Sequence, residues 1–442
     1  MPFIARSGAD RGWAPMRRAA GVVLLLLALL AVAAGCRGLH PPPRAAAPAP
    51  SATVLLVSID GFRWDYLDLY QPPTLQRLAR EGVRAERLIP SFPTKTFPNH
   101  YTLVTGLYPA HHGVIANNMY DPLLDARFAM SDRGAVGDGR WWGGVPLWVT
   151  AERRGLPTAP MFWPGSEAAI QGVRPRYWQP FDHHMPGAAR VEQVLAWLDL
   201  PPGERPAFLT LYFSDVDSAG HDFDPVSPQV AAAVGEVDRH LGALVAGLEA
   251  RGIYDEVDLV VVSDHGMSDT SAERVVVLDE WIDLDDVRIV DLNPVAMLAP
   301  LEGRGERVYD ALRRAPGLTV YRQGEVPPEL HFSGHRRIPE ILALAEDGWS
   351  IATRSGLEAR PHRFDGGNHG YDPRLPSMHA LFVARGPHFV AGAVVPPFES
   401  VHVYELMAAI LGLEPAPNDG DLGVVRQLLS SVEQVAPDRA AP

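Results

Sequence analysis

The sequence predicts an α/β fold in which a mostly parallel central sheet is covered by helices on both faces. Three short segments are almost wholly apolar, as expected of strands buried on both sides: 54–59, 208–213 and 259–262. Segments with helical periodicity alternate with them, which is typical of parallel strands joined by crossover helices. Each apolar segment is followed within two residues by an aspartate, and ligands of such sheets bind beyond the carboxyl ends of the strands.

The remaining elements follow in a regular order. Apolar residues recur at helical spacing in 73–81, where Gly82 ends the pattern, and again in 191–198. Ser227 is placed to open a long helix that runs to Gly252. A further strand at 380–383 and a final helix at 403–411 complete the predicted fold.

The first residues of the 442-residue chain have the pattern of an export signal. Four arginines and one aspartate precede an uncharged run from Ala19 to Ala34, which is short for a membrane span of about 20 residues. The run ends in Ala-Ala-Gly-Cys, which resembles a bacterial lipobox, so we expect residues 1–35 to be removed and Cys36 to carry a lipid anchor. An ordinary signal peptide and an uncleaved membrane anchor are the alternatives.

The lipid would hold the exported protein on a bilayer of the bacterial envelope. Arg37 is not the aspartate typical of inner-membrane retention, which favours the periplasm-facing side of the outer membrane. Residues 36–52, rich in proline and alanine, predict a semi-extended tether. Residues 53–428 then form one large domain, and residues 429–442 a flexible tail.

Composition excludes several classes of protein. Because Cys36 is the single cysteine, an intramolecular disulfide and a thiolate zinc cluster are both impossible. Without residues 1–35 the chain has 35 basic and 52 acidic residues, a net charge of −17. This balance argues against a stable complex with nucleic acid.

Three aspartates and three histidines lie where the predicted sheet would gather them at one edge. They follow the three strands or a later Gly-Asn segment, and they are Asp60, Asp217, His221, Asp264, His265 and His369. Singly, each is equally explained as a helix cap, a turn former or a structural histidine. Together, oxygen and nitrogen ligands without sulfur suit Zn²⁺ or a similar divalent cation, and six of them can hold two ions.

Residues 93–102 predict a helix N-terminus near this edge. Pro98 fits only the first turn of a helix, so the helix should begin at Thr96 or Phe97. Backbone N–H groups at such an end favour an anion. The Thr96 hydroxyl is therefore a candidate nucleophile if a metal ion lowers its pKa, and a plain N-cap role is the alternative.

Several motifs together closely resemble the nucleotide pyrophosphatase/phosphodiesterase family of the alkaline phosphatase superfamily. They lie in the family's order between residues 53 and 415, at 93–100, 105–109, 112–113, 117–122, 161–165, 217–221, 263–267 and 369–371. The resemblance implies an alkaline phosphatase-like fold with a smaller inserted cap region. It also implies a hydrolase with two Zn²⁺ that releases nucleoside 5′-monophosphates through a phosphothreonine intermediate.

The resemblance also assigns roles to individual residues. Thr96 would be the nucleophile, Asn117 would donate its amide to a phosphate oxygen, and Phe97 and Phe181 would line a slot for the base. Tyr177 and Trp178 are alternatives to Phe181. One zinc would be held by Asp217, His221 and His369, and the other, beside Thr96, by Asp60, Asp264 and His265.

Other functions of the same superfamily stay open. They are a phosphodiesterase acting on glycerophospho- or choline-type diesters and a phosphonate hydrolase. A sulfatase is disfavoured, since that branch needs a cysteine or serine in its own motif and Cys36 lies at the lipobox. A non-catalytic metal-binding surface lipoprotein is the alternative from a different class, but it would not need Thr96 beside all six ligands.

Overall fold

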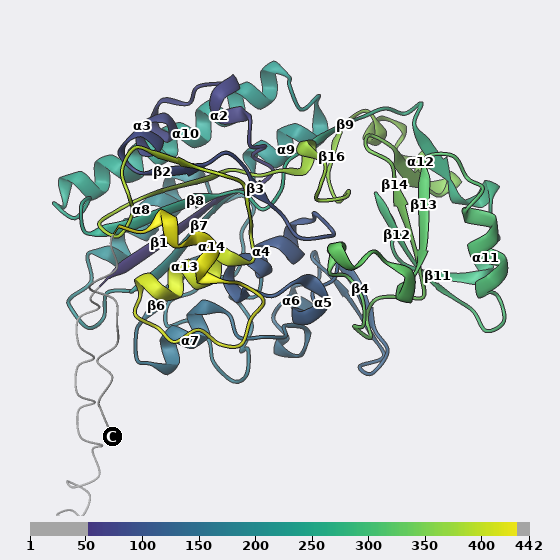
Figure 1. Cartoon of the computed structure of the whole chain (residues 1–442), viewed down its shortest axis with the longest axis horizontal. Helices are drawn as coiled ribbons and strands as arrows, with labels where there is room; N and C mark the ends of the chain where they lie inside the picture. Colours follow the sequence, from purple (N-terminus) through teal and green to yellow (C-terminus); the bar gives the residue numbers. More distant parts are fainter. Residues whose placement is uncertain (1–51, 431–442) are drawn as a thin grey trace, which may run out of the picture. The chain divides into compact units, whose positions relative to one another are not determined.

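The computed structural model describes residues 52–430 (Figure 1). The predicted signal peptide, Cys36 and nearly all of the tether and the tail lie outside these residues, so they stay predictions. Within residues 52–430, no helix combines the length and the apolar character needed to cross a membrane.

A seven-stranded sheet forms the centre of the fold. Strand β1 pairs in parallel with β7 on one side and with β8 on the other, and only β17 runs against the other strands of this sheet. The mostly parallel α/β architecture is therefore confirmed. In spatial order the strands are β18 (Ala393–Val395), β2 (Val83–Ala85), β17 (Phe382–Arg385), β8 (Val257–Val262), β1 (Thr53–Ile59), β7 (Phe208–Phe213) and β6 (Thr158–Met161).

Different helices cover the two faces of this sheet, because alternate residues of a strand point to opposite sides. Leu55 and Val57 of β1 pack with α3 (Pro73–Glu81), α8 (Gly187–Leu198) and α10 (Pro228–Ala250). Val54 and Leu56 pack with α4 (Thr96–Thr105), α7 (Leu147–Arg153) and α13 (His402–Ile410). Both faces are thus buried, as the apolar runs predict.

The predicted boundaries lie close to the observed ones. Helix α3 and strand β7 match their predicted ranges. Helix α10 begins where expected, since the Ser227 hydroxyl accepts the Val230 N–H at 3.2 Å. The strand predicted at 380–383 is β17, which lies two residues later and pairs antiparallel with β8.

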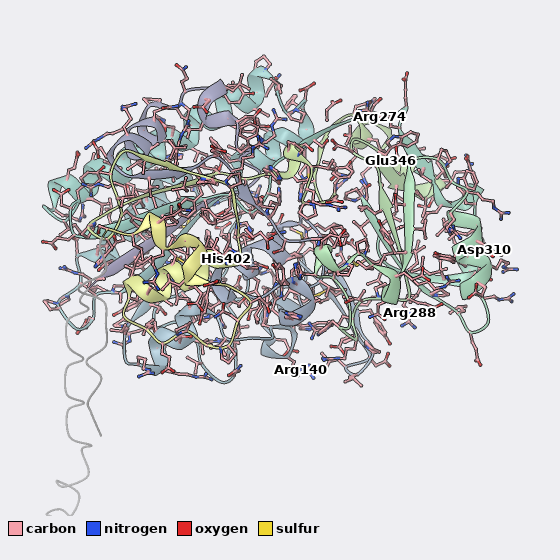
Figure 2. The ribbon with its side chains drawn as sticks, viewed as in Figure 1. Arg140, Arg274, Arg288, Asp310, Glu346 and His402 are labelled. Carbon is pink, nitrogen blue, oxygen red and sulfur yellow. The ribbon has the colours of Figure 1, made fainter. Side chains whose placement is uncertain are left out.

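A second, four-stranded antiparallel sheet is inserted in the chain between β8 and β17. Its order is β11 (Val287–Asp291), β12 (Val295–Pro300), β14 (Ile341–Ala345) and β13 (Leu318–Arg322), and α11 (Gly305–Leu312) packs on β13 and β14. Arg288 of β11, labelled in Figure 2, lies over the ring of Tyr120 at 4.2 Å. This contact joins the insert to the hairpin of β4 (Asn118–Asp121) and β5 (Ala126–Ala129).

The other elements are short, and one pair of them positions the site. Strand β16 (Gly366–Asn368) pairs with β9 (Ser268–Thr270) and packs against α9 (Asp215–Asp222), which brings the loop after β16 beside that helix. The rest are α2 (Tyr66–Leu69), α5 (Pro109–His112), α6 (Arg133–Val136), α12 (Arg354–Ala359), α14 (Leu422–Val425), β3 (Leu88–Ile89), β10 (Val275–Val277), β15 (Ser350–Ala352) and β19 (Phe398–Glu399).

Candidate functional site

Three neighbouring parallel strands end at the candidate site. Asp60 directly follows β1, and Asp264 and His265 follow β8 after one serine. Helix α9 begins two residues after β7 and carries Asp217 and His221 one turn apart. The edge at which the sequence predicts a ligand site therefore does collect these side chains.

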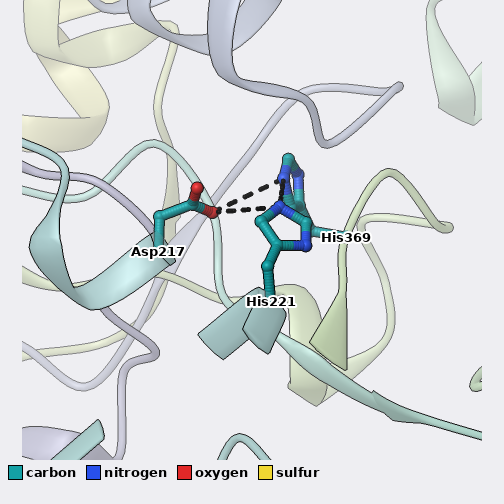
Figure 3. A group of neighbouring side chains, drawn as sticks. All are labelled: Asp217, His221 and His369. Atoms are coloured by element: carbon teal, nitrogen blue, oxygen red, sulfur yellow. Dashed lines mark hydrogen bonds and ion pairs between the residues drawn. The ribbon is translucent and has the colours of Figure 1, made fainter. Parts of the chain in front are cut away.

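Asp217, His221 and His369 form one group of possible metal ligands (Figure 3). Asp217 Oδ1 lies 3.5 Å from His221 Nε2 and 3.6 Å from His369 Nε2, and the two Nε2 atoms are 3.1 Å apart. The Nδ1 atoms of His221 and His369 face the backbone carbonyls of Gly367 and Thr94, at 3.0 and 2.8 Å. A carbonyl only accepts, so each Nδ1 donates to its carbonyl and each Nε2 is directed toward Asp217.

Asp60, Asp264 and His265 form a second group beside Thr96. His265 Nε2 lies 3.4 Å from Asp60 Oδ1 and 3.0 Å from Asp264 Oδ2, while its Nδ1 donates to the Gly266 carbonyl at 2.9 Å. The Thr96 hydroxyl lies 3.4 Å from the same Nε2. Because Asp217 also lies near Asp60 and His265, the two groups are contiguous, and all six residues meet.

One oxygen of each aspartate has no hydrogen-bond donor. The Tyr212 hydroxyl donates to Asp60 Oδ2 at 2.7 Å, and the Gly61 N–H donates to Asp264 Oδ1 at 3.3 Å. By contrast, Asp60 Oδ1, Asp217 Oδ1 and Asp264 Oδ2 are buried and accept no hydrogen bond from any described residue. An unpartnered buried carboxylate oxygen is costly, and these three face the histidine Nε2 atoms, so the residues fit divalent cations.

Neighbouring groups of the same kind disfavour the charged forms of Asp60 and His369. Burial, together with the charges of Asp264 and Asp217, raises the pKa of Asp60 well above its ordinary value. Burial, together with His265 and His221, lowers the pKa of His369 well below its ordinary value. Bound cations would relieve both effects, because they attract the carboxylates and need neutral imidazoles.

Thr96 is the first helical residue of α4, and Pro98 lies in the first turn as predicted. Lys95 occupies the N-cap position with an extended backbone, and within the described chain no side chain caps this helix. The plain N-cap interpretation of Thr96 is therefore wrong. Its hydroxyl points instead toward His265 of the second metal group.

Two predicted substrate residues, Phe97 and Asn117, are hydrogen-bonded to each other next to this threonine. Asn117 Oδ1 accepts the Phe97 N–H at 3.0 Å, which leaves the Asn117 amide Nδ2 to donate elsewhere. The Phe97 ring packs against Phe128 and Trp142, with centroids 5.9 and 6.0 Å apart. The Phe97 backbone thus fixes the orientation of Asn117, while its ring packs against Phe128 and Trp142.

Phe181 belongs to a different aromatic cluster. Its ring lies 5.1 Å from Phe162 and 6.1 Å from Tyr212, whose hydroxyl holds Asp60. Of the two alternatives, Tyr177 stacks on Trp197 at 6.3 Å, and Trp178 lies under the Arg174 guanidinium at 4.7 Å. Among the three, Phe181 is the one joined to a metal-ligand neighbour.

Two residues of the site were not singled out from the sequence. Tyr212 is one, and His100 is the other. His100 Nδ1 donates to the Thr96 carbonyl at 2.9 Å and lies 3.2 Å from Asp264 Oδ2, and its Nε2 is 2.8 Å from the Ser58 hydroxyl. Since both its ring nitrogens are engaged, His100 supports the site, and its position four residues after Thr96 on one helix face is the signal that could have revealed it.

Comparison with known proteins finds relatives over the same region. Residues 54–372 match the family model described as type I phosphodiesterase / nucleotide pyrophosphatase. Human ectonucleotide pyrophosphatase/phosphodiesterase family member 5 is 36% identical over 380 residues, which are 86% of this chain and 78% of that protein. A venom phosphodiesterase of Crotalus durissus collilineatus is 37% identical over 389 residues, but the chain spans only 46% of its length.

Solved structures of these relatives share the fold. The murine ectonucleotide pyrophosphatase/phosphodiesterase 5, described as an inactive threonine-to-alanine form in complex with AMP, superposes with a TM-score of 0.82 at 36% identity. The match covers 86% of this chain and all of the murine one. The human counterpart gives the same TM-score, identity and coverage.

Proposed function

The chain belongs to the type I phosphodiesterase/nucleotide pyrophosphatase family, and from this premise we propose that it cleaves phosphodiester or pyrophosphate bonds of nucleotides and releases nucleoside 5′-monophosphates. One observation carries the proposal. Three buried carboxylate oxygens that accept no hydrogen bond from residues 52–430 face three histidine Nε2 atoms, and the Thr96 hydroxyl lies 3.4 Å from one of these, that of His265. Such a site suits attack on a phosphodiester, whose negative charge resists an unassisted anionic nucleophile.

Two Zn²⁺ ions are the proposed cofactor. Their ligands would be Asp217, His221 and His369 for one ion, and Asp60, Asp264 and His265 for the other. When bound, the pair would supply Lewis-acid stabilisation of the negative charge on the attacking and leaving oxygens. The orientations of the three imidazole rings already match this use, since every Nδ1 is turned to a carbonyl and every Nε2 to the site.

Thr96 is the proposed nucleophile. Its Oγ forms a bond to phosphorus, the hydroxyl proton is released to solvent, and the bond from phosphorus to the leaving oxygen breaks with its electron pair. Water then attacks phosphorus on the side opposite Oγ and gives up a proton, the bond between phosphorus and Oγ breaks, Oγ takes up a proton to restore the hydroxyl, and the monophosphate leaves. The inactivity of the murine threonine-to-alanine form supports an essential threonine in such a site.

Asn117 and two aromatic rings would bind the rest of the substrate. Asn117 Nδ2 is free to donate to a non-bridging phosphate oxygen, because its Oδ1 is held by the Phe97 N–H. Phe97 and Phe181 would offer ring faces to the nucleobase, and stacking of this kind tolerates any base. The AMP complex of the murine relative supports a nucleotide as the ligand.

The substrate class is tested by measuring hydrolysis rates side by side. The panel is the nitrophenyl ester of thymidine monophosphate, ATP, a dinucleotide and glycerophosphocholine. We expect nucleoside 5′-monophosphates from the first three at higher kcat/KM than choline or glycerol release from the fourth. Preference for glycerophosphocholine would instead establish the alternative diesterase function.

The nucleophile is tested by Thr96→Ala, with Thr105→Ala as a matched control on the same helix. Thr105 lies at the end of α4 and its hydroxyl donates to the Tyr101 carbonyl. We expect Thr96→Ala to lower kcat by more than about 10³-fold while metal content is unchanged, and Thr105→Ala to keep its turnover. Undiminished hydrolysis by Thr96→Ala would remove Thr96 from this role.

The location of the protein is a separate proposal. We infer export and lipid anchoring through Cys36, with the domain facing the periplasm from the outer membrane. Cys36→Ala should then release the protein from the membrane fraction, whereas the unaltered chain should sediment with outer membranes. A Cys36→Ala protein that stays in the membrane fraction would contradict the lipid anchor.

A further inference from the structure

The side chain of the residue before the proposed nucleophile forms an ion pair and a hydrogen bond with the inserted sheet and the residues that follow its first strand. Lys95 is 4% exposed, and its ammonium forms an ion pair with Asp291 at the end of β11. The same ammonium donates to the Asn293 carbonyl at 3.0 Å. A buried lysine has three donors to satisfy, and here the insert supplies acceptors for two of them.

Asp291 also binds a second segment of the site. Its Oδ2 accepts the Lys95 ammonium, and its Oδ1 accepts Asn118 Nδ2 at 3.1 Å. Lys95 directly precedes Thr96, and Asn118 directly follows Asn117. One carboxylate therefore binds the chain neighbours of both residues that would act on the phosphate.

The strand is built so that Asp291 reaches this position. The pairing of β11 with β12 shifts in register between Ile289 and Asp291, so that Asp291 lies opposite Met297 although Ile289 lies opposite Leu298. This extra residue is a β-bulge, a feature that redirects a side chain and occurs preferentially beside active sites. Asp291 is 8% exposed and Lys95 is 4% exposed, so this ion pair is buried.

We propose that Asp291 is a positioning residue for the reaction, which sets the spacing between the Thr96 hydroxyl and the Asn117 amide through Lys95 and Asn118. The inference rests on the proposed function. A displacement of about 1 Å between reacting groups can cost about 10²-fold in rate. The inserted sheet would thus act on the chemical step, although it supplies none of the six candidate metal ligands.

Asp291→Asn tests this role with little change of shape. An asparagine offers one acceptor oxygen and one NH₂ group, so only one of Lys95 and Asn118 keeps its acceptor. We expect kcat to fall about 10²-fold while KM stays within about threefold and zinc content is unchanged. Inhibition by orthovanadate, a transition-state analogue, should weaken in proportion to kcat, and inhibition by AMP should not.

The matched control is Asp286→Asn in the same insert. Asp286 is 6% exposed and pairs with Arg304 and Arg307, so its substitution also removes the charge of a buried aspartate, although both of its partners are exposed. It should leave kcat and vanadate inhibition unchanged. Equal losses in the two variants, or a loss in Asp291→Asn that vanadate inhibition does not follow, would overturn the positioning role.

A gentler variant covers the case in which Asp291→Asn does not fold, since it weakens the pairing of a buried lysine. Asn118 is exposed, and Asn118→Ala removes only its hydrogen bond to Asp291 while the ion pair of Lys95 with Asp291 remains. It should lower kcat and vanadate affinity together by roughly tenfold, about half of the full effect on a free-energy scale. Unchanged values in a folded Asn118→Ala would overturn the inference.

The two proposals fail in different ways. If the unaltered protein does not hydrolyse the nucleotide panel, or Thr96→Ala still does, the proposed function fails. If the unaltered protein is active and Thr96→Ala is not, but the Asp291 and Asn118 variants match Asp286→Asn, only the positioning inference fails.

Discussion

Arg337 of the insert contacts Trp141, whose ring packs against Phe128 beside Phe97. We expect Arg337→Met to lower the free energy of unfolding by about 4 kcal/mol. The side chain is nearly inaccessible to solvent, and its guanidinium lies 4.8 Å from the ring of Trp141. Its donors reach four acceptors, which are Asp121 Oδ2 at 2.7 Å and the carbonyls of Gly113 at 2.6 Å, Trp141 at 2.7 Å and Arg140 at 3.1 Å.

The magnitude follows from what the substitution leaves behind. Removing one partner of a buried ion pair costs about 3–5 kcal/mol. Asp121 keeps a second partner, Arg336, which reduces that cost. Three carbonyls lose a charged donor, and each carbonyl that stays buried without a new donor costs about 1–3 kcal/mol. These costs overlap, so about 4 kcal/mol is the expected net loss.

The change is measured as a shift of the midpoint of thermal unfolding. Unfolding entropy of about 2.1 cal/mol/K per residue gives roughly 0.8 kcal/mol/K for residues 52–430. A loss of about 4 kcal/mol therefore lowers Tm by about 5 °C. Calorimetry at one pH and one zinc concentration is the assay, since bound metal stabilises the folded state.

Arg336→Met is the control, because Arg336 pairs with the same Asp121 carboxylate. The Arg336 side chain is 41% exposed, whereas that of Arg337 is 3% exposed. An exposed partner contributes less than about 1 kcal/mol, so Arg336→Met should lower Tm by about 1 °C or less. Equal shifts for the two variants would refute the reasoning, because burial would then not decide the cost.

Further outcomes test the metals and the polar groups around them. Metal analysis should find about two zinc ions per chain, and a chelator should abolish turnover until zinc is returned; full activity of the metal-free protein would exclude the two-metal site. Tyr212→Phe frees the second oxygen of Asp60 and should lower zinc affinity about 10–100-fold in a chelator competition, so an unchanged affinity would contradict its role. Asn117→Ala should lower kcat about 10²–10³-fold with zinc retained, and a change in KM alone would argue against transition-state stabilisation. Burial, together with Arg337 and Arg336, lowers the pKa of His335 to about 4. Because the unfolded chain takes up this proton near pH 6.5, the contribution of the neutral imidazole to the free energy of unfolding is complete above pH 6.5 and is lost as the pH falls toward 4. His335→Asn should flatten that decline in denaturant titrations, and an identical decline would show that another group causes it.

Four strands of the central sheet, β1, β7, β8 and β17, could be predicted because they are almost wholly apolar and buried, whereas β2, β6 and β18 could not. Such strands are continuous apolar runs, as in 54–59 and 259–262, and they stand out without any knowledge of their partners. Only part of the four-stranded insert carries a comparable signal: β12 and β14 are apolar runs, but nothing local shows that they belong to a second, antiparallel sheet. Its strand β13 is only partly buried, so its residues mix Thr319 and Tyr321 with Leu318 and Val320 and look like an ordinary loop.

The ligands of the site were predictable for a related reason, and their geometry was not. Asp60 and Asp264 follow strands whose carboxyl ends must meet in a parallel sheet. Which nitrogen of each histidine faces the site depends on carbonyls in separate loops, such as those of Thr94 and Gly367. The pair of Lys95 and Asp291 joins residues 196 positions apart, and no local pattern marks such a contact.

Three consecutive residues attach the proposed nucleophile to three separate parts of the chain. The Thr94 carbonyl accepts from the ring of His369 in the loop after β16, and the Lys95 ammonium pairs with Asp291 of the insert. The Thr96 hydroxyl lies beside His265 at the end of β8. Because the backbone of 94–96 cannot move at one of these residues without straining its neighbours, the site is complete only when all three parts are folded. Substitutions in the insert that break the contact between Lys95 and Asp291 should accordingly change the rate of the chemical step, although they touch neither metal ligand nor substrate.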